Sequence, residues 1–214
     1  MNAAQARAVL AKMSPKQKQA LAARRRTRKA HPLRFFSLWE RKAKPPRNLG
    51  RVRLRPEVER SSQAWVFREH VVDALAVVGG NGSSKTWTGA VMAVCCLLGR
   101  DHPDVQALIE RHGLNADLIP PDGGLVIASS LNSAMSVNIL RPLVAQFAPD
   151  AEVGWRNRDG QGEAVCYRLD DPTKRIIFKS NDQGWEKYQG YAACLVWLDE
   201  EHDQKVYREC QQRV

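Results

Sequence analysis

The chain has 214 residues and a formal net charge of +10 at pH 7, and hydrophobic residues make up 43% of it. This composition fits one sizeable globular domain with an appendage and excludes a fibrous or wholly disordered chain. No apolar stretch reaches the roughly 18 residues that span a bilayer, and the N-terminus lacks the apolar core of a signal peptide. We therefore expect neither membrane insertion nor export, and we expect the five cysteines to be reduced core residues of a cytosolic protein.

The positive charge is concentrated at the N-terminus. Residues 1–60 contain 18 Lys and Arg against 3 Glu, whereas the rest of the chain has 15 basic against 20 acidic residues. The sequence thus predicts a basic helical arm with a linker over 1–60, and a separate domain over 61–214.

Two helices are expected in the arm, over 2–13 and 15–30, with Ser14 as N-cap of the second and Pro15 at its first position. A basic run over 24–29 continues into further Lys and Arg that alternate with three aromatic residues, Phe35, Phe36 and Trp39. Such a mixture can bind phosphates and stack on bases. A solvated helical extension whose aromatics dock onto the next domain is the alternative, and we favour it slightly over direct, sequence-specific DNA contact. Prolines over 43–60 then indicate the linker.

From residue 61 the pattern alternates between strands and helices. The expected elements, in chain order, are a short helix or turn at 63–73, a strand at 74–78, a helix at 85–99, a connection through Pro120 and Pro121, a strand at 124–128, a helix at 130–147, paired strands at 164–169 and 175–179, and a strand within the apolar run from 193. Two successive strand-turn-helix units predict an α/β fold with a parallel sheet.

The turn between the strand at 74–78 and the helix at 85–99 has the composition of a phosphate-binding loop. It comprises Gly79, Gly80, Asn81, Gly82, Ser83, Ser84, Lys85 and Thr86. Glycines let backbone N–H groups approach a phosphate chain at a helix start, where a lysine and a hydroxyl follow. The pattern G-x-x-x-x-G-K-[ST] requires glycine where this chain has Ser84, so the match is imperfect.

A second segment supports the interpretation of residues 79–86 as a phosphate-binding loop. The apolar run from residue 193 ends abruptly in three carboxylates, Asp199, Glu200 and Glu201, as a Walker B strand does. A core strand followed by a solvated acidic turn is the plain alternative. In the nucleotide-binding interpretation Lys85 neutralises the β- and γ-phosphates, Thr86 and Asp199 hold Mg²⁺, and Glu200 deprotonates the attacking water. The acidic pair favours ATP hydrolysis over phosphoryl transfer to a small acceptor.

Three stretches together resemble the ATPase portion of a tailed-phage terminase large subunit. They are the loop at 79–86, the stretch at 180–190 (SNDQGWEKYQG) and the strand end at 196–201 (VWLDEE). The middle stretch makes the resemblance specific, because P-loop ATPases in general share only the other two. The resemblance covers about residues 61–214, and it implies a P-loop NTPase domain of the ASCE type with a basic helical N-terminal extension.

The resemblance implies an ATP-driven motor that docks at the portal of an empty capsid in the host cytoplasm and translocates double-stranded DNA inward. It further implies Mg²⁺ as cofactor, a portal protein and a terminase small subunit as partners, and a homo-oligomeric ring in the complete enzyme. Gln63 lies where an adenine-contacting segment is expected, although a glutamine on a surface helix is the commoner explanation.

Three departures from the family pattern matter. Asn81 stands where many terminases carry a charge-stabilising arginine, so Arg68 or a neighbouring subunit would have to supply that charge. Ser84 replaces the last glycine of the loop. The chain also stops at Val214, before the expected coupling motif and nuclease domain, which suggests a truncated or split product. The alternatives are an inactive remnant that binds DNA or a partner, and another helicase-like P-loop ATPase.

Overall fold

A computed structural model describes residues 13–30, 33, 85–160 and 163–212. Apart from the helix at 15–30, the elements expected before residue 85 lie outside these residues, as do the predicted linker and domain boundary. Within the described part of the chain, no helix is both long and apolar enough to cross a membrane.

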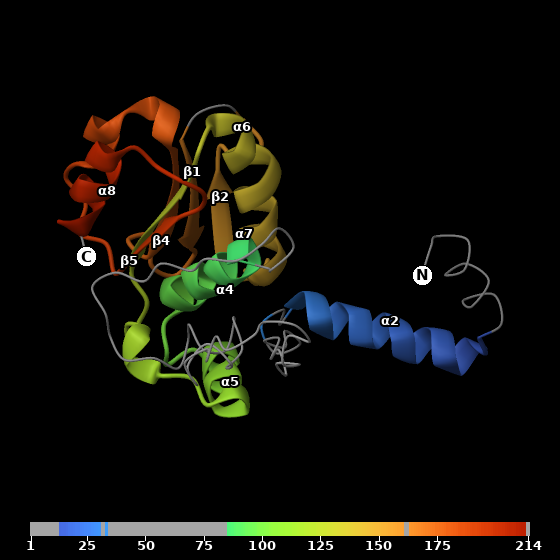
Figure 1. The fold of residues 1–214 in the computed structure, drawn as a ribbon. Coiled ribbons are helices and arrows are strands. Elements are labelled where there is room, and N and C mark those ends of the chain that lie inside the picture. The colour runs from blue at the N-terminus through green and yellow to red at the C-terminus, as the bar shows by residue number, and fades with distance from the viewer. Residues whose placement is uncertain (1–12, 31–32, 34–84, 161–162, 213–214) are drawn as a thin grey trace, which may run out of the picture.

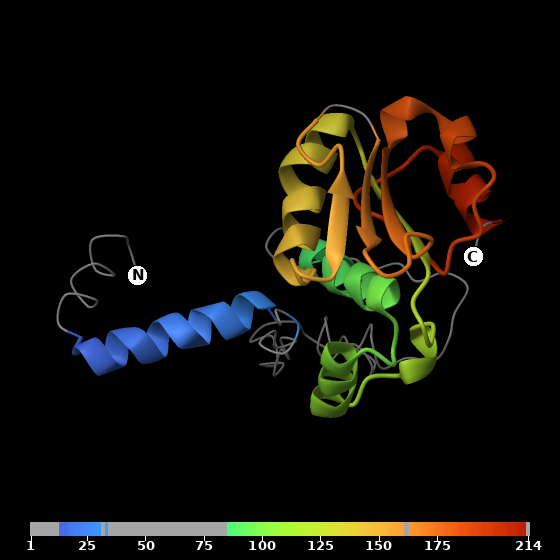
Figure 2. The same ribbon diagram turned by 180° about the vertical axis from the view of Figure 1, so that it is seen from behind.

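The helix predicted after Ser14 is confirmed as α2, Pro15–Ala30. Its start is closed by a reciprocal pair of hydrogen bonds: the Gln17 backbone N–H donates to Ser14 Oγ at 3.2 Å, and the Ser14 N–H donates to Gln17 Oε1 at 2.8 Å. Such a capping box satisfies two N–H groups that a helix start otherwise leaves without partners. In both ribbon views α2 stands apart from the α/β body (Figures 1 and 2).

A five-stranded sheet forms the centre of the α/β body, with strand order β2-β3-β4-β1-β5. The strands are β1 Leu125–Ser130, β2 Val153–Arg156, β3 Ala164–Arg168, β4 Arg175–Ser180 and β5 Leu195–Leu198. β1 pairs in parallel with both β4 and β5, whereas β3 is antiparallel to β2 and β4. The paired strands predicted at 164–169 and 175–179 are therefore confirmed as a hairpin, and the expected parallel sheet is in fact mixed.

Helices cover both faces of this sheet (Figures 1 and 2). The elements are α4 Lys85–Leu98, α5 Pro103–His112, η3 Ala116–Leu118, α6 Ser133–Met135, the π-helical η4 Ser136–Leu140, α7 Arg141–Phe147, η5 Asn181–Gln183, η6 Trp185–Tyr188 and α8 Gln204–Gln211. α4 and α7 pack on one face, and η6 and α8 on the other.

Side chains along each strand alternate between these two faces of the sheet. Val126 and Ala128 of β1 belong to the apolar cluster under α4, while Ile127 between them belongs to the cluster with Tyr188 and Val206. Successive side chains of a strand point to opposite faces, so a continuous apolar strand becomes buried on both. α4 itself buries nine of its residues, which explains its almost wholly apolar sequence.

The elements that the sequence does not predict include α5 and β2. α5 lies in the segment that we interpreted as a connection, although His102 caps it, Pro103 begins it and Gly113 ends it in a left-handed conformation. β2 is a four-residue edge strand, too short to show an apolar period. The loop after it is fixed by the buried Arg141, which donates to the carbonyls of Arg158 and Gly160 at 3.0 and 2.7 Å.

Candidate functional site

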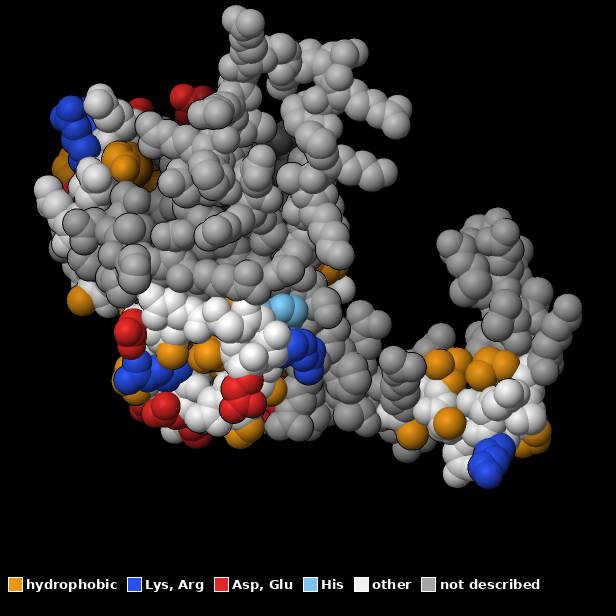
Figure 3. Space-filling model, turned by 60° about the horizontal axis from the view of Figure 1, so that its bottom comes forward, with side chains coloured by type: hydrophobic (Ala, Val, Ile, Leu, Met, Phe, Trp, Pro, Cys, Tyr) orange, Lys and Arg blue, Asp and Glu red, His pale blue; other side chains and the backbone are white. Residues whose placement is uncertain are grey.

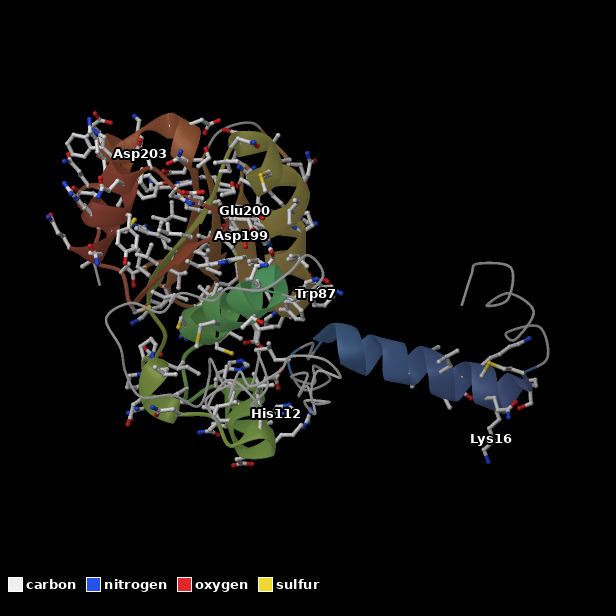
Figure 4. All side chains as sticks on the ribbon, in the orientation of Figure 1. Lys16, Trp87, His112, Asp199, Glu200 and Asp203 are labelled. Atoms are coloured by element: carbon white, nitrogen blue, oxygen red, sulfur yellow. The ribbon has the colours of Figure 1, made fainter. Side chains whose placement is uncertain are left out.

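Polar residues follow the apolar runs of three neighbouring parallel strands. β1 ends in Ser129 and Ser130, β4 ends in Ser180, and Asp199 comes directly after β5. Because these strands run in the same direction, their carboxyl ends meet at one edge of the sheet, where ligands of open α/β sheets bind. Figure 4 shows Asp199 and Glu200 at this edge, above the start of α4.

The first turn of α4 brings the Thr86 hydroxyl to this edge. Thr86 Oγ1 donates to Asp199 Oδ2 at 3.4 Å, although 113 positions separate the two residues in sequence. One helical turn further on, Gly89 lies against the Trp197 ring, so closely that an added Cβ would stand 2.3 Å from ring atoms. Residues three apart share a helix face and residues two apart share a strand face. The Gly89–Trp197 contact therefore aligns α4 on β5 so that Thr86 meets Asp199.

Asp199 is a buried carboxylate, with 8% of its surface exposed. Burial raises its pKa above the ordinary aspartate value, and the nearby charge of Glu200 adds to this effect. The hydrogen bond from Thr86 and the positive charge of Lys85 lower the pKa of Asp199 in opposition. Its backbone N–H donates to Ser129 O at 2.8 Å, which extends the β1–β5 ladder by one residue and fixes the carboxylate in place.

Glu200 is exposed and has a positive φ of 72°, a conformation that residues other than glycine rarely adopt. Its carbonyl lies 3.1 Å from His202 Nδ1. The other nitrogen of this ring, Nε2, lies 2.8 Å from Ser129 Oγ, and Ser129 Oγ in turn lies 2.6 Å from Tyr188 Oη. Burial lowers the pKa of His202, which favours the neutral ring.

The stretch at 180–190 follows β4 and connects the turns after β1 and β5 at this edge. Asn181 Oδ1 accepts from the Asp203 backbone N–H at 3.0 Å, at the start of α8. Asp182 Oδ2 accepts from the Ser133 N–H at 3.3 Å, at the start of α6. Hydrogen bonds, foremost that with Ser180, hold the pKa of Asp182 below its usual value. The residues of this stretch thus bind the turns after β1 and β5 to each other.

The structure therefore brings together four of the predicted site residues. Lys85 and Thr86 open α4, and Asp199 and Glu200 follow β5. The predicted phosphate-loop residues 79–84 and Gln63 lie outside the described residues, so their roles stay predictions. Sequence reasoning assigned no role to Ser129, Tyr188 or His202. The available signal was a pair of serines closing an apolar strand, together with a histidine three residues after Asp199.

The donor set fits a magnesium ion in its chemistry. Thr86 and Asp199 present a hydroxyl and a carboxylate, the hard oxygen ligands that Mg²⁺ prefers, and a cation would offset the burial of Asp199. Among the described residues no group of three or more His, Cys, Asp or Glu could hold a metal ion. A site that shares its ion with substrate phosphates does not need such a group, because phosphate oxygens and water complete the coordination.

The described surface around α5 has no concentration of positive charge that would indicate a DNA-binding surface. The described surface around α5 mixes acidic, basic and hydrophobic side chains instead of presenting one sign of charge (Figure 3). The basic run at 24–29 belongs to α2, and the aromatic residues that follow it lie outside the described part of the chain. DNA contact by the arm therefore stays a prediction.

The fold and site together define an α/β domain with helices on both sheet faces and a polar site at the carboxyl edge of its parallel strands. The family model described as terminase large subunit, T4likevirus-type, N-terminal, matches residues 76–214. The chain therefore belongs to this family, as its three motifs indicated, and the family implies a component of a phage DNA-packaging motor. No curated protein and no solved structure gave a significant match.

Proposed function

We propose that this chain supplies the ATP-hydrolysing part of a viral DNA-packaging motor that moves double-stranded DNA into a procapsid. One observation carries the proposal: Thr86 Oγ1 and Asp199 Oδ2 lie 3.4 Å apart at the carboxyl edge of the sheet. A P-loop hydroxyl and a Walker B carboxylate must meet in this way to share one magnesium ion. The family match supports the assignment, since its members are generally ATPases.

Each described residue then has a distinct task. Lys85, at the first position of α4, counters phosphate charge together with the positive end of the helix. Thr86 and Asp199 would hold Mg²⁺, which when bound neutralises charge on the phosphate oxygens. Glu200 is exposed next to them and orients the attacking water while accepting its proton. Residues 79–84 would enclose the phosphates, and Gln63 would contact the adenine.

The wider assembly belongs to the same proposal. A motor of this type acts at the portal of the procapsid in the host cytoplasm, as a homo-oligomeric ring that receives DNA from a small subunit. Asn81 provides no charge for the transition state, so we propose that Arg68 or an arginine from a neighbouring copy does so.

The test compares two adjacent acids. Glu200→Gln should preserve ATP binding while lowering kcat by about 10²- to 10⁴-fold, the usual contribution of a general base. Glu201→Gln is the matched control, because it removes an exposed carboxylate one position further on, outside the proposed machinery. ATP binding and steady-state phosphate release are measured on the intact gene product. Equal turnover in Glu200→Gln and wild type would remove Glu200 from the mechanism, and absence of hydrolysis by wild type would favour an inactive remnant.

A further inference from the structure

The backbone of Glu200 needs support from its surroundings. A residue with a side chain at φ of 72° is destabilised relative to the right-handed conformation by roughly 1–2 kcal/mol, and such a geometry persists only when neighbouring groups fix it. His202 provides one such contact, because its Nδ1 lies 3.1 Å from the Glu200 carbonyl oxygen. The orientation of the Glu200 side chain depends on this backbone conformation.

One tautomer of the neutral His202 ring gives every bond in this network a donor and an acceptor. A carbonyl oxygen only accepts, so His202 Nδ1 must carry the proton that it shares with Glu200 O. In the neutral ring Nε2 is then an acceptor, and Ser129 Oγ, at 2.8 Å, must donate to it. Having used its only proton, Ser129 Oγ accepts from Tyr188 Oη at 2.6 Å.

The far end of this chain of bonds is anchored in the core. Tyr188 and Ser129 are both fully buried, and burial raises the pKa of Tyr188 to about 12, so the phenol keeps its proton at neutral pH. Tyr188 comes from the stretch at 180–190, Ser129 from β1 and His202 from the loop after β5. Three separate segments thus form one chain of hydrogen bonds that ends at the Glu200 carbonyl.

The loop between β5 and α8 is held at both ends as well. The Asp199 N–H donates to Ser129 O at 2.8 Å, and the Asp203 N–H donates to Asn181 Oδ1 at 3.0 Å. His202 acts between these two points, where no strand or helix would otherwise order Glu200. Among the described residues, His202 therefore provides the side-chain hydrogen bond to the backbone of Glu200.

We propose that His202 is a positioning residue that orients Glu200 through its carbonyl, and that Ser129 and Tyr188 hold the His202 ring in the Nδ1–H tautomer. The inference rests on the proposed function, in which Glu200 activates water. It assigns a task to three residues outside the phosphate and metal contacts, and it links the stretch at 180–190 to the hydrolytic step.

Kinetics separate positioning from mere stabilisation. His202→Ala should lower kcat for ATP hydrolysis by about 10- to 100-fold, because displacement of a catalytic group by about 1 Å can cost that much. The dissociation constant for a non-hydrolysable ATP analogue should stay within about twofold, since binding does not require Glu200 in this mechanism. His202→Asn, whose amide can still donate to Glu200 O, should recover part of the rate.

His102→Ala is the matched control. His102 also uses both ring nitrogens, with Nε2 2.7 Å from Glu152 Oε2 and Nδ1 accepting from the Asp104 N–H, but it caps α5 away from the site. This control should retain the wild-type kcat. An unchanged kcat in His202→Ala, or an equal loss in both alanine variants, would overturn the proposal.

A spectroscopic measurement keeps this inference separate from the proposed function. In ¹⁵N-histidine NMR spectra of the wild type near neutral pH, His202 should show a protonated Nδ1 and an unprotonated Nε2, and Ser129→Ala should weaken this preference. The opposite tautomer in the wild type would refute the network even in an active enzyme. The expected tautomer in a protein that hydrolyses no ATP would instead refute the proposed function and leave the network in place.

Discussion

Replacing Gly89 by alanine tests the contact that aligns α4 on β5. The new Cβ would stand 2.3 Å from Cε2 and Nε1 of Trp197, whereas ordinary van der Waals contacts begin at 3.4 Å. The overlap of about 1 Å falls on a bicyclic ring that is itself buried between the helix and the sheet, so it cannot be relieved by rotation of a flexible side-chain end. Either α4 or Trp197 has to move.

Two opposing effects decide the sign of the change in stability. Alanine in a helix interior is favoured over glycine by about 0.8–1.0 kcal/mol. Overpacking a close-packed core costs about 1–3 kcal/mol, and the size of this overlap places the cost in the upper part of that range. We therefore expect Gly89→Ala to lower the free energy of unfolding by about 1–2 kcal/mol, against the helix propensity.

A double-mutant cycle with Trp197→Leu isolates the contact. With the ring removed, the same Gly89→Ala change should stabilise the protein by about 0.5–1 kcal/mol, so the two backgrounds should differ by about 2 kcal/mol. Urea unfolding followed by far-UV circular dichroism measures both, and equal m-values would show that the unfolded states are comparable. A stabilising Gly89→Ala in both backgrounds would refute the packing argument.

Two further predictions concern buried titratable groups. The Lys179 side chain is 1% exposed, and its Nζ lies 2.7 Å from Oε2 of Glu163, whose side chain is 41% exposed. Glu163→Gln should therefore destabilise the protein more than Lys179→Met, because it leaves the ammonium buried without its counter-charge. The reverse order of the two variants in urea unfolding would contradict this. Burial raises the pKa of Cys95 from 9.0 to about 12, so the unfolded chain releases this proton first and the free energy of unfolding falls as pH rises from 9 toward 12. Cys95→Ala should reduce that slope, and an unchanged slope would exclude Cys95 as its source.

Local chemistry explains which elements the sequence could predict. α2 and α4 carry their start signals within a few residues, and each strand of the hairpin has its own apolar run, so all three are confirmed. The start and stop signals of α5 are equally local, but they stand in a polar segment without a clear apolar period. β2 is different, because its four residues become a strand only by pairing with β3, which periodicity cannot reveal.

The candidate site likewise has one part that the sequence predicts and another that it does not. Thr86 and Asp199 could be paired in advance because two recognisable motifs imply a common ion, and the structure brings them into contact. The bond between His202 and Ser129 joins residues 73 positions apart, and it exists only because Ser129 faces Leu198 in the register of β1 and β5. No motif specifies such a pair, so tertiary structure was required to find it.

The register of β5 connects stability and chemistry in this domain. Trp197 and Asp199 lie on the same side of the strand, two residues apart, and they contact Gly89 and Thr86, which lie one turn apart on α4. A slip of β5 by one residue would turn both side chains to the opposite face. The Gly89–Trp197 contact and the Thr86–Asp199 contact therefore depend on the same register. The His202 network imposes the same register from the other face, because Tyr188 and Ser129 are buried there. The packing of two aromatic residues on opposite faces of the sheet thereby determines where the two adjacent acids stand relative to the first turn of α4.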